Sequence, residues 1–199
     1  MSTRDSILDA AEEIFVNKGF SGSSMKSIAE KAAVAKSLLY HYFASKRELW
    51  DEVIQGRISN ARLPERMIEM VSSIAQGDLK AIRTQKNHTT YFEFLKDNPQ
   101  FVRMLAWLNA EQSMWMCPPH EMRQEVIDKL KQVQEKGVIR DDIDPRMFVI
   151  CLMSICEMWF MSRNKISAWF GEEMNMDEMS KKYIDAVGKI LLDGMVGSK

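Results

Sequence analysis

The segment over residues 24–49 constrains the fold of this chain most, because its spacing predicts two short helices joined by a tight turn. The segment is SMKSIAEKAAVAKSLLYHYFASKREL. Apolar positions at helical spacing predict the buried faces, and they are Ile28, Ala29, Ala32, Val34, Leu38, Leu39 and Phe43. The positions left facing outward carry cations, hydroxyls and rings, and they are Lys36, Ser37, Tyr40, His41, Tyr42 and Lys46. Such a surface on the second helix indicates insertion into the major groove of DNA.

The same segment, with the helix before it, resembles the N-terminal part of the TetR family of one-component transcriptional regulators. The matching positions are Ile7-Leu8-Asp9-Ala10-Ala11, Phe15, Lys18-Gly19-Phe20, Ser24, Ile28-Ala29, Ala32-Ala33-Val34, Lys36-Ser37, Leu39-Tyr40-His41-Tyr42-Phe43 and Lys46-Arg47-Glu48-Leu49. The match extends from the N-terminus to about position 55, and beyond it only length and helical character agree. The resemblance implies an all-α homodimer whose N-terminal head binds double-stranded operator DNA and whose C-terminal part binds a small-molecule effector.

The turn between the two short helices departs from the family pattern. Ala33 stands where the family usually has Gly, and Ser37-Leu38 stands where Gly-Thr or Pro-Thr is common. Two outcomes are open for position 33: a positive φ on a non-glycine residue, at a cost of about 1 kcal/mol, or a slightly different turn. The base sequence of the operator half-site therefore cannot be copied from a relative.

Helical patterns continue through the rest of the chain. A first helix ends at Gly19, and a fourth opens at Ser45 with Glu48 completing a capping box. The fourth helix is expected to run past Leu63, with a kink or break at Pro64. Later helices are predicted over about 78–97, 99–115, 122–137, 145–170 and 176–190, the fourth of them starting at Asp144-Pro145. The chain is therefore expected to fold as about nine helices, without strands.

Charge is divided unevenly along the chain. The net charge is −1, yet residues 23–47 hold five cations and one anion, a local balance of +4. The remainder carries about −5, and this asymmetry orients the N-terminal region toward DNA. We expect a DNA-binding head over residues 1–61, with its helix-turn-helix motif at about 24–43, and a regulatory domain over residues 62–199. Acidic residues interrupt the N-terminus, so we expect no signal peptide, no membrane partner and a cytoplasmic location.

Residues 147–161, MFVICLMSICEMWFM, are apolar on all sides apart from Ser154 and Glu157. The segment is shorter than the roughly 20 residues that a membrane span needs, so it is expected to be buried on two sides, one against its own domain and one against something else. In the resembled family, the last two helices form a four-helix bundle with the same pair of a second subunit. The resemblance therefore implies a homodimer, and the stripe that suits its interface contains Tyr183, Val187 and Ile190.

The resemblance also implies roles for the outward residues of the head. The residues expected to anchor the DNA backbone are Ser24, Tyr40, Tyr42 and Lys46. Lys36 and Ser37 are the expected base readers, since Lys prefers guanine O6 and N7. Two alternatives are open for Leu38, a thymine methyl or the core, and two for His41, a phosphate contact or a helix cap. Any one of these residues, taken alone, fits an ordinary solvated surface better.

The C-terminal two-thirds of the chain concentrates its 16 methionines and five tryptophans. Two interpretations are open: core filling with a dimer seam, or a plastic pocket for a lipophilic or planar aromatic ligand. The residues expected to line such a pocket are Tyr91, Met104, Trp107, Glu111, Ile155, Glu157 and Trp159. Glu157 needs a partner or a raised pKa. Its candidate partners are Arg163 or Lys165 in an ion pair, or a cationic ligand bound beside Tyr91 and Glu111.

No catalytic pattern competes with this interpretation. The sequence has no glycine-rich phosphate loop, His-x-x-x-His pair, nucleophile elbow or acid dyad at fixed spacing. Cys117, Cys151 and Cys156 lack metal-ligand spacing and are expected to be buried, with a redox switch as the alternative. We therefore expect no enzyme activity, cofactor or metal. The favoured function is a sequence-specific repressor released by a small lipophilic or aromatic ligand; the alternative is an activator or a regulator controlled by a protein partner.

Overall fold

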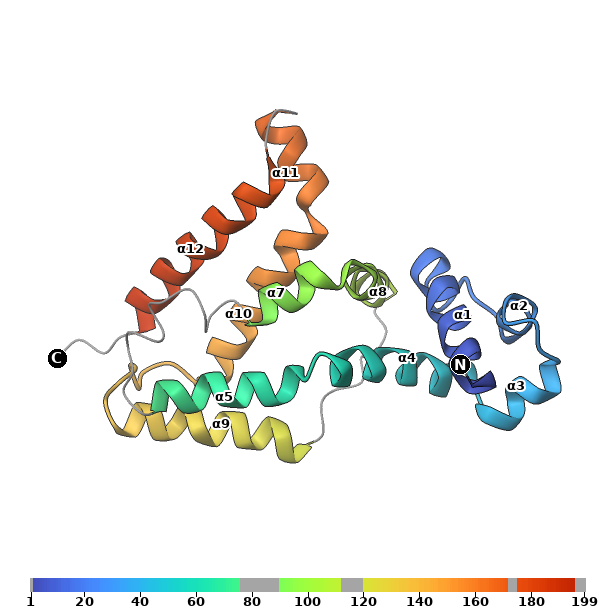
Figure 1. Cartoon of the computed structure of the whole chain (residues 1–199). Coiled ribbons are helices and arrows are strands. Elements are labelled where there is room, and N and C mark those ends of the chain that lie inside the picture. The colour runs from blue at the N-terminus through green and yellow to red at the C-terminus, as the bar shows by residue number, and fades with distance from the viewer. Residues whose placement is uncertain (1, 76–89, 112–119, 172–174, 196–199) are drawn as a thin grey trace. The chain divides into compact units, whose positions relative to one another are not determined.

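The computed structural model describes residues 2–75, 90–111, 120–171 and 175–195, and within these ranges the chain forms eleven helices and no strand (Figure 1). This confirms the expected all-α class. The expected helix start at about residue 78, and Cys117, lie outside the described residues. The chain divides into two compact units, one made of residues 1–61 with 98–116 and the other of residues 62–97 with 117–199.

The first unit contains the N-terminal helices and one helix from later in the chain. These are α1 (Thr3–Lys18), α2 (Met25–Lys31), α3 (Lys36–Tyr42), α4 (Lys46–Asn60) and α8 (Pro99–Ala110). Helix α1 packs against α2, α4 and α8. The centre of the unit is aromatic, because the Phe15 ring meets the Trp50 ring edge-on at 4.7 Å between centroids and both side chains are buried.

The turn between α2 and α3 has the hydrogen bonds of a Schellman motif. Ser24 caps α2, and at the other end the Val34 N–H donates to the Ala29 carbonyl at 3.0 Å and the Ala33 N–H to the Glu30 carbonyl at 3.2 Å. Ala33 has a φ of 54°, so of the two outcomes left open for this position the structure has the positive φ on a non-glycine residue. A methyl group is therefore held in the left-handed region that glycine favours.

Two expected helices are divided, the fourth a few residues before the break expected at Pro64 and the 145–170 helix where none was expected. The fourth ends at Asn60, and Arg62, with a φ of 49°, separates it from α5 (Leu63–Ala75). Pro64 then lies in the first turn of a new helix, where a missing N–H costs no hydrogen bond. The long helix after residue 144 divides at Ser162 into α10 (Pro145–Met161) and α11 (Arg163–Phe170), which are bent by 65°.

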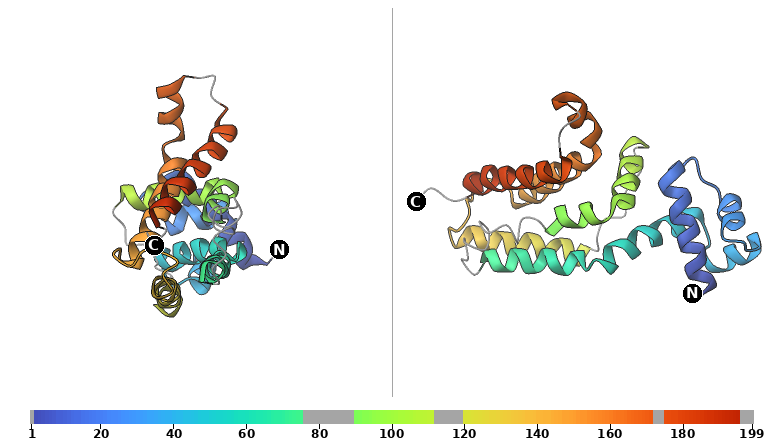
Figure 2. Two further views of the ribbon diagram at one scale, coloured as in Figure 1. Left: turned by 90° about the vertical axis from the view of Figure 1, so that its left-hand side faces the viewer. Right: turned by 45° about the horizontal axis from the view of Figure 1, so that its top comes forward.

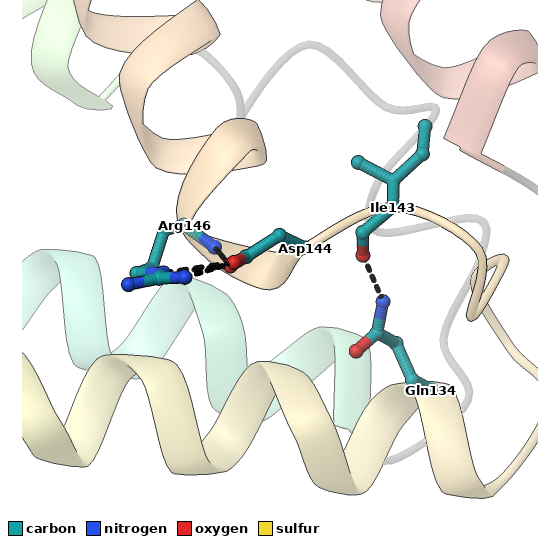
Figure 3. Close-up of polar contacts among 4 residues, drawn as sticks. All are labelled: Gln134, Ile143, Asp144 and Arg146. Carbon is teal, nitrogen blue, oxygen red and sulfur yellow. Dashed lines mark hydrogen bonds and ion pairs between the residues drawn. The ribbon is translucent and has the colours of Figure 1, made fainter.

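The second unit is built on the pairing of α5 with α9 (His120–Glu135), which lie side by side in Figures 1 and 2. Its remaining helices are α7 (Thr90–Asp97), α10, α11 and α12 (Met176–Met195). Asp144 caps α10 by accepting from the Arg146 N–H at 2.9 Å, as the Asp-Pro pair predicts (Figure 3). The Asp144 pKa is lowered to about 2, because Arg146 and its backbone N–H bind the carboxylate. Gln134 ties the preceding loop to α9 by donating to the Ile143 carbonyl at 2.7 Å.

Helix α10 is less buried than its composition predicts. Of its 17 residues, only Cys156 and Trp159 are buried in the single chain. Beyond the exposed Arg146 near its start, the exposed positions recur every three or four residues, and they are Met147, Ile150, Cys151, Ser154 and Met158. The single chain therefore leaves one face of α10, uncharged beyond Arg146, in solvent, and burial of that side against something outside its own domain stays a prediction.

Among the described helices, none alone is long and apolar enough to cross a membrane, although α10 and α11 together pass that test of length and composition despite their bend.

Candidate nucleic-acid interface and effector residues

Helix α3 presents almost its whole surface to solvent, because Leu39 is its one buried residue. The exposed side chains are Lys36, Ser37, Leu38, Tyr40, His41 and Tyr42. Leu38 is 37% exposed, so the alternative that places it in the core is wrong. Leu39 and Phe43, the residue that follows α3, are fully buried and fix the helix to the rest of the first unit. The arrangement leaves a rigid, outward face of hydroxyls, rings and one lysine.

Lys36 differs from the other four cations of residues 23–47. Its ammonium lies over the Tyr40 ring, 5.7 Å from the centroid. Three of the others face anions in ion pairs, Lys26 with Glu30, Lys31 with Glu13 and Arg47 with Asp51. A cation held over an exposed ring beside a helix start stays available to a nucleic-acid partner.

Lys46, the fifth cation, is bound to the backbone of the loop between α1 and α2. Its ammonium donates to the Phe20 carbonyl at 2.7 Å and to the Ser23 carbonyl at 2.9 Å, and it lies 4.2 Å from the centroid of the Phe20 ring. Its role as a phosphate anchor stays a prediction. Two of its three N–H groups are engaged inside the protein, which sequence reasoning did not foresee.

Ser24 is exposed and its hydroxyl accepts from the Ser27 N–H at 3.0 Å. The same pair completes a capping box, because the Ser27 hydroxyl accepts from the Ser24 N–H at 3.2 Å. The cap leaves the start of α2 at the surface, where its dipole favours a phosphate.

Three of the predicted effector residues lie in the first unit, Met104 and Trp107 on α8 and Glu111 as the C-cap residue that follows it. Met104 is fully buried, the Trp107 indole N–H donates to the Val16 carbonyl at 3.2 Å, and the Glu111 carboxylate accepts from the Ser21 N–H at 3.1 and 3.3 Å. The polar groups of Trp107 and Glu111 are thus committed to the backbone of the first unit.

The other four predicted effector residues lie in the second unit, where Tyr91 meets Glu157. The Tyr91 hydroxyl donates to the Glu157 carboxylate at 2.6 Å. Burial raises the pKa of Glu157, and burial beside that carboxylate raises the pKa of Tyr91. Arg163, proposed as an ion-pair partner, instead faces Asp177 at 3.6 Å. Tyr91 on α7 and Glu157 on α10 therefore form a hydrogen-bonded pair between these two helices.

Aromatic rings continue from this pair. Trp159 stacks on Tyr183 with 4.2 Å between centroids, and its indole N–H donates to the Ser180 hydroxyl at 3.0 Å. The Tyr183 hydroxyl donates to the Ile155 carbonyl at 3.0 Å. Tyr183 and Val187, predicted at a dimer interface, thus pack within the second unit, whereas Ile190 is 73% exposed.

Among the residues that the structure describes, no cluster of three or more His, Cys, Asp or Glu side chains could hold a metal ion. Cys151 is exposed, so the expectation that it is buried is wrong, while Cys156 is buried as expected. Burial raises the pKa of the Cys156 thiol to about 12.

Comparison with known sequences decides the family. The pattern described as "Bacterial regulatory proteins, tetR family" matches residues 7–53, and the pattern described as "Tetracyclin repressor-like, C-terminal domain" matches residues 81–191. The chain belongs to the TetR family. TetR proteins are DNA-binding transcriptional regulators and not enzymes, so this chain is a regulator.

Individual TetR relatives and solved structures agree along most of the chain. NicS, a transcriptional repressor from Pseudomonas putida, is 22% identical over 97% of this chain and 92% of its own length. UidR, a transcriptional regulator from Escherichia coli, is 30% identical over 73% of each chain. A transcriptional regulator from Streptomyces coelicolor superposes with a TM-score of 0.69 at 23% identity, covering 95% of this chain and 98% of its own.

The TetR motif located the α3 surface, but it did not identify three contacts around the α1–α2 loop. Lys46, Trp107 and Glu111 all bind backbone groups of residues 16–23. The sequence around each of these residues predicts a helix and shows a charged or aromatic side chain. It does not indicate which backbone group that side chain binds. The exposed stripe on α10 was also missed, although its three- and four-residue spacing is visible in the sequence.

Proposed function

We propose that this protein is a homodimeric repressor that leaves its operator when a small lipophilic or aromatic ligand binds. The observation that carries the proposal is the exposed face of α3, where Lys36 and Ser37 stand at the helix start beside solvent-facing rings. In this proposal Lys36 and Ser37 read base edges, while Ser24, Tyr40, Tyr42 and Lys46 anchor the backbone. Its DNA-binding head comprises residues 1–61, its regulatory domain residues 62–199, and it acts in the cytoplasm.

Dimerisation is supported by the exposed uncharged face of α10 and by Ile190 on α12. A soluble monomer rarely leaves so regular an apolar stripe in water. Two copies joined through these faces form a bundle with an interface of about 2,000 Å² or more. The two heads then reach half-sites separated by about one helical turn, roughly 34 Å, or a multiple of it.

A ligand site in the second unit is supported by the Tyr91–Glu157 pair and the adjacent stacked rings. Ile155 and Trp159 add an apolar wall on α10 to this pair. Indoles stack on planar ligands, and a partly buried carboxylate selects a group that donates hydrogen bonds or carries positive charge. FadR from Bacillus subtilis, which shares the fold with a TM-score of 0.58 at 17% identity, was crystallised with stearoyl-CoA, so this fold accommodates a long lipophilic ligand.

The experiment that tests the proposal measures linkage between DNA and ligand. Selection from random duplexes first defines the operator, and thermal-shift screening of lipophilic and aromatic compounds finds a ligand. Release requires a difference in affinity between the two states of about 3 to 5 kcal/mol, so saturating operator must weaken ligand binding by the same factor. Quenching of Trp159 fluorescence reports the binding. If every tight ligand binds free and operator-bound protein equally well, ligand-relieved repression is wrong.

An activator is the second candidate, because FasR of Mycolicibacterium smegmatis, named a transcriptional activator, is 31% identical over 51% of this chain. The two candidates differ in the sign of the effect on a reporter gene placed behind the selected operator. Expression that rises when the protein is added identifies an activator.

A further inference from the structure

The loop between α1 and α2, residues 19–23, is held by side chains from two other helices of the first unit. From α4, Lys46 donates to the Phe20 and Ser23 carbonyls. From the end of α8, Glu111 accepts from the Ser21 N–H. Backbone groups of a loop are usually satisfied by water, so this concentration of side-chain partners on one short loop needs an explanation.

Trp107 extends the contact to the end of α1. Its indole N–H donates to the carbonyl of Val16, in the last turn of that helix, where carbonyls have no partner within the helix. Trp107 and Glu111 are four residues apart and therefore lie on the same face of α8. One face of α8 thus binds both the last turn of α1 and the loop that follows it.

Gly19 makes this approach possible. It has a φ of 70°, and a Cβ added there would lie 2.6 Å from Oε1 of Glu111 and 2.8 Å from Cδ2 of Trp107. No side chain fits in that space without moving α8 side chains. The glycine therefore serves two needs: the turn after α1 and the close contact with Trp107 and Glu111.

The loop leads directly into the DNA-binding motif. Ser23 is buried, and Ser24, the next residue, caps α2. Helix α2 packs against α3, whose exposed face carries the predicted base readers. A displacement of residues 19–23 therefore moves the start of α2. Hydrogen bonds between the recognition helix and the bases are lost when that helix shifts by only a fraction of the length of a hydrogen bond.

We propose that Glu111 and Trp107 are positioning residues that hold the α1–α2 loop in the conformation that binds operator DNA. Helix α8 follows α7 after the single residue Asn98, and α7 carries Tyr91 of the Tyr91–Glu157 pair. The side chains that set the loop thus belong to a helix covalently continuous with the candidate effector residues. The assignment gives Glu111 and Trp107 a role in DNA affinity instead of ligand contact, and it rests on the DNA-binding activity of the family, not on ligand release.

The first test replaces Glu111. Hydrogen exchange of the Ser21 amide, operator affinity and urea unfolding are measured for Glu111→Ala, Glu111→Gln and the control Glu125→Ala, which removes an exposed carboxylate from α9. We expect Ser21 to exchange at least about tenfold faster in Glu111→Ala and operator binding to weaken by about tenfold, with unfolding close to that of the control. Glu111→Gln, which keeps an acceptor oxygen, recovers part of both losses.

The second test compares two glycines that have a similar positive φ but different surroundings. Gly19→Ala and Gly137→Ala both place a methyl at φ near 70°, but nothing lies within 4 Å of a Cβ at Gly137. Gly19 also has an extended ψ of −176°, so weaker operator binding by Gly19→Ala than by Gly137→Ala measures displacement of the loop, to which this strain and the clash with Trp107 and Glu111 both contribute. The proposal is wrong if Glu111→Ala and Gly19→Ala both bind the selected duplex as tightly as their control variants do. The assay contains no ligand, so its result is independent of the release mechanism.

Discussion

The two compact units of this chain are held together by different kinds of contact. In the first unit, three ion pairs join separate helices, beside two within one helix: Arg4 on α1 with Glu52 on α4, Lys31 on α2 with Glu13 on α1, and Arg57 on α4 with Glu12 on α1. In the second unit, most ion pairs join neighbours three or four residues apart on one helix, as Lys129 with Glu125 and Lys189 with Asp185.

Between helices of the second unit, contacts between aromatic rings accompany the hydrogen bonds of Tyr91 with Glu157 and of Trp159 with Ser180. Phe92 on α7 lies 4.7 Å from Phe160 on α10, and Trp159 on α10 stacks on Tyr183 of α12. Directional polar contacts specify one arrangement, whereas apolar contacts tolerate several of similar energy. The difference suits the proposed function, in which the DNA target has a fixed spacing and the ligand site adapts to its ligand.

The largest expected effect tests whether the exposed apolar face of the second unit joins two copies. Ile190→Arg places a charge on an exposed side chain, so the fold of the single chain is preserved while a dimer is broken. We expect a monomer by sedimentation and operator binding weaker by about 100-fold or more, because one head meets half the phosphates. Lys181→Ala, also exposed on α12, is the control and should stay dimeric. A well-folded wild-type monomer at micromolar concentration would contradict the dimer.

The next effect sharpens the comparison within the first unit, between a cation that faces solvent and one that holds the loop. Lys36→Ala should change the preferred base at one symmetric operator position, with a discrimination of about 1 to 3 kcal/mol lost. Lys46→Ala should weaken binding to all sequences alike, and it should destabilise the first unit because two carbonyls lose their donor. Sequence selection and the salt dependence of the affinity separate the two. Identical base preferences for wild type and Lys36→Ala would remove Lys36 from the reading set.

A smaller effect concerns the buried carboxyl of the second unit. Burial raises the pKa of Glu157, so the folded state keeps its proton to a higher pH than the unfolded chain. The stability from this group is therefore present below the unfolded pKa and lost as pH rises through the folded pKa. Glu157→Gln should gain stability relative to wild type between about pH 4.5 and pH 8, by less than about 1 kcal/mol because the carboxylate is partly exposed.

Urea unfolding as a function of pH measures this change. The control is Glu178→Gln: the hydrogen bond from Lys182 lowers the pKa of Glu178, so the contribution of this carboxylate is complete above the unfolded pKa, and the pH slope of this variant should equal that of wild type between about pH 4.5 and pH 8. If the free energy of unfolding changes with pH equally in Glu157→Gln and wild type, Glu157 is as well solvated in the folded state as in the unfolded chain.

The smallest effect is at Ala33. Ala33→Gly removes the methyl from a φ of 54° but adds backbone freedom to the unfolded chain, so a net gain of about 0.5 kcal/mol is expected. Ala32→Gly, one residue earlier at a helical φ, should instead lose about 0.5 to 1 kcal/mol. Denaturant midpoints give both values, and a loss at position 33 would show that the turn depends on the alanine methyl.

The features that sequence predicted well depend on neighbours a few residues apart. The Ser24 cap, the Asp144 cap and the positive φ at Ala33 each follow from local hydrogen-bonding rules, and all three are present. The bend at Ser162 could not be predicted, because neither proline nor glycine marks it. Nor could the burial of Leu39 with the exposure of Leu38, since adjacent apolar residues on a short helix compete for one buried face.

The partners of charged groups were the harder part of the site. Lys46 suited a phosphate by composition and motif, but the structure gives its ammonium two carbonyls of the α1–α2 loop, which is separated from it in the chain by both helices of the DNA-binding motif. Glu157 had two cations nearby in the sequence, yet its partner is the hydroxyl of Tyr91 on another helix. Such pairs depend on how separate helices pack together, and a short stretch of one sequence does not predict that packing.

The contacts of Trp107 and Glu111 with the end of α1 and the α1–α2 loop affect whether the DNA-binding head can be transferred to another protein. The family pattern for the head ends at residue 53, and a chimera cut after α4 would carry the operator-reading surface without α8. In such a hybrid the Val16 carbonyl and Ser21 amide would meet whatever the recipient has in place of Trp107 and Glu111. Transplanting the DNA specificity of this regulator therefore requires grafting two side chains that the apparent boundary of the module leaves behind.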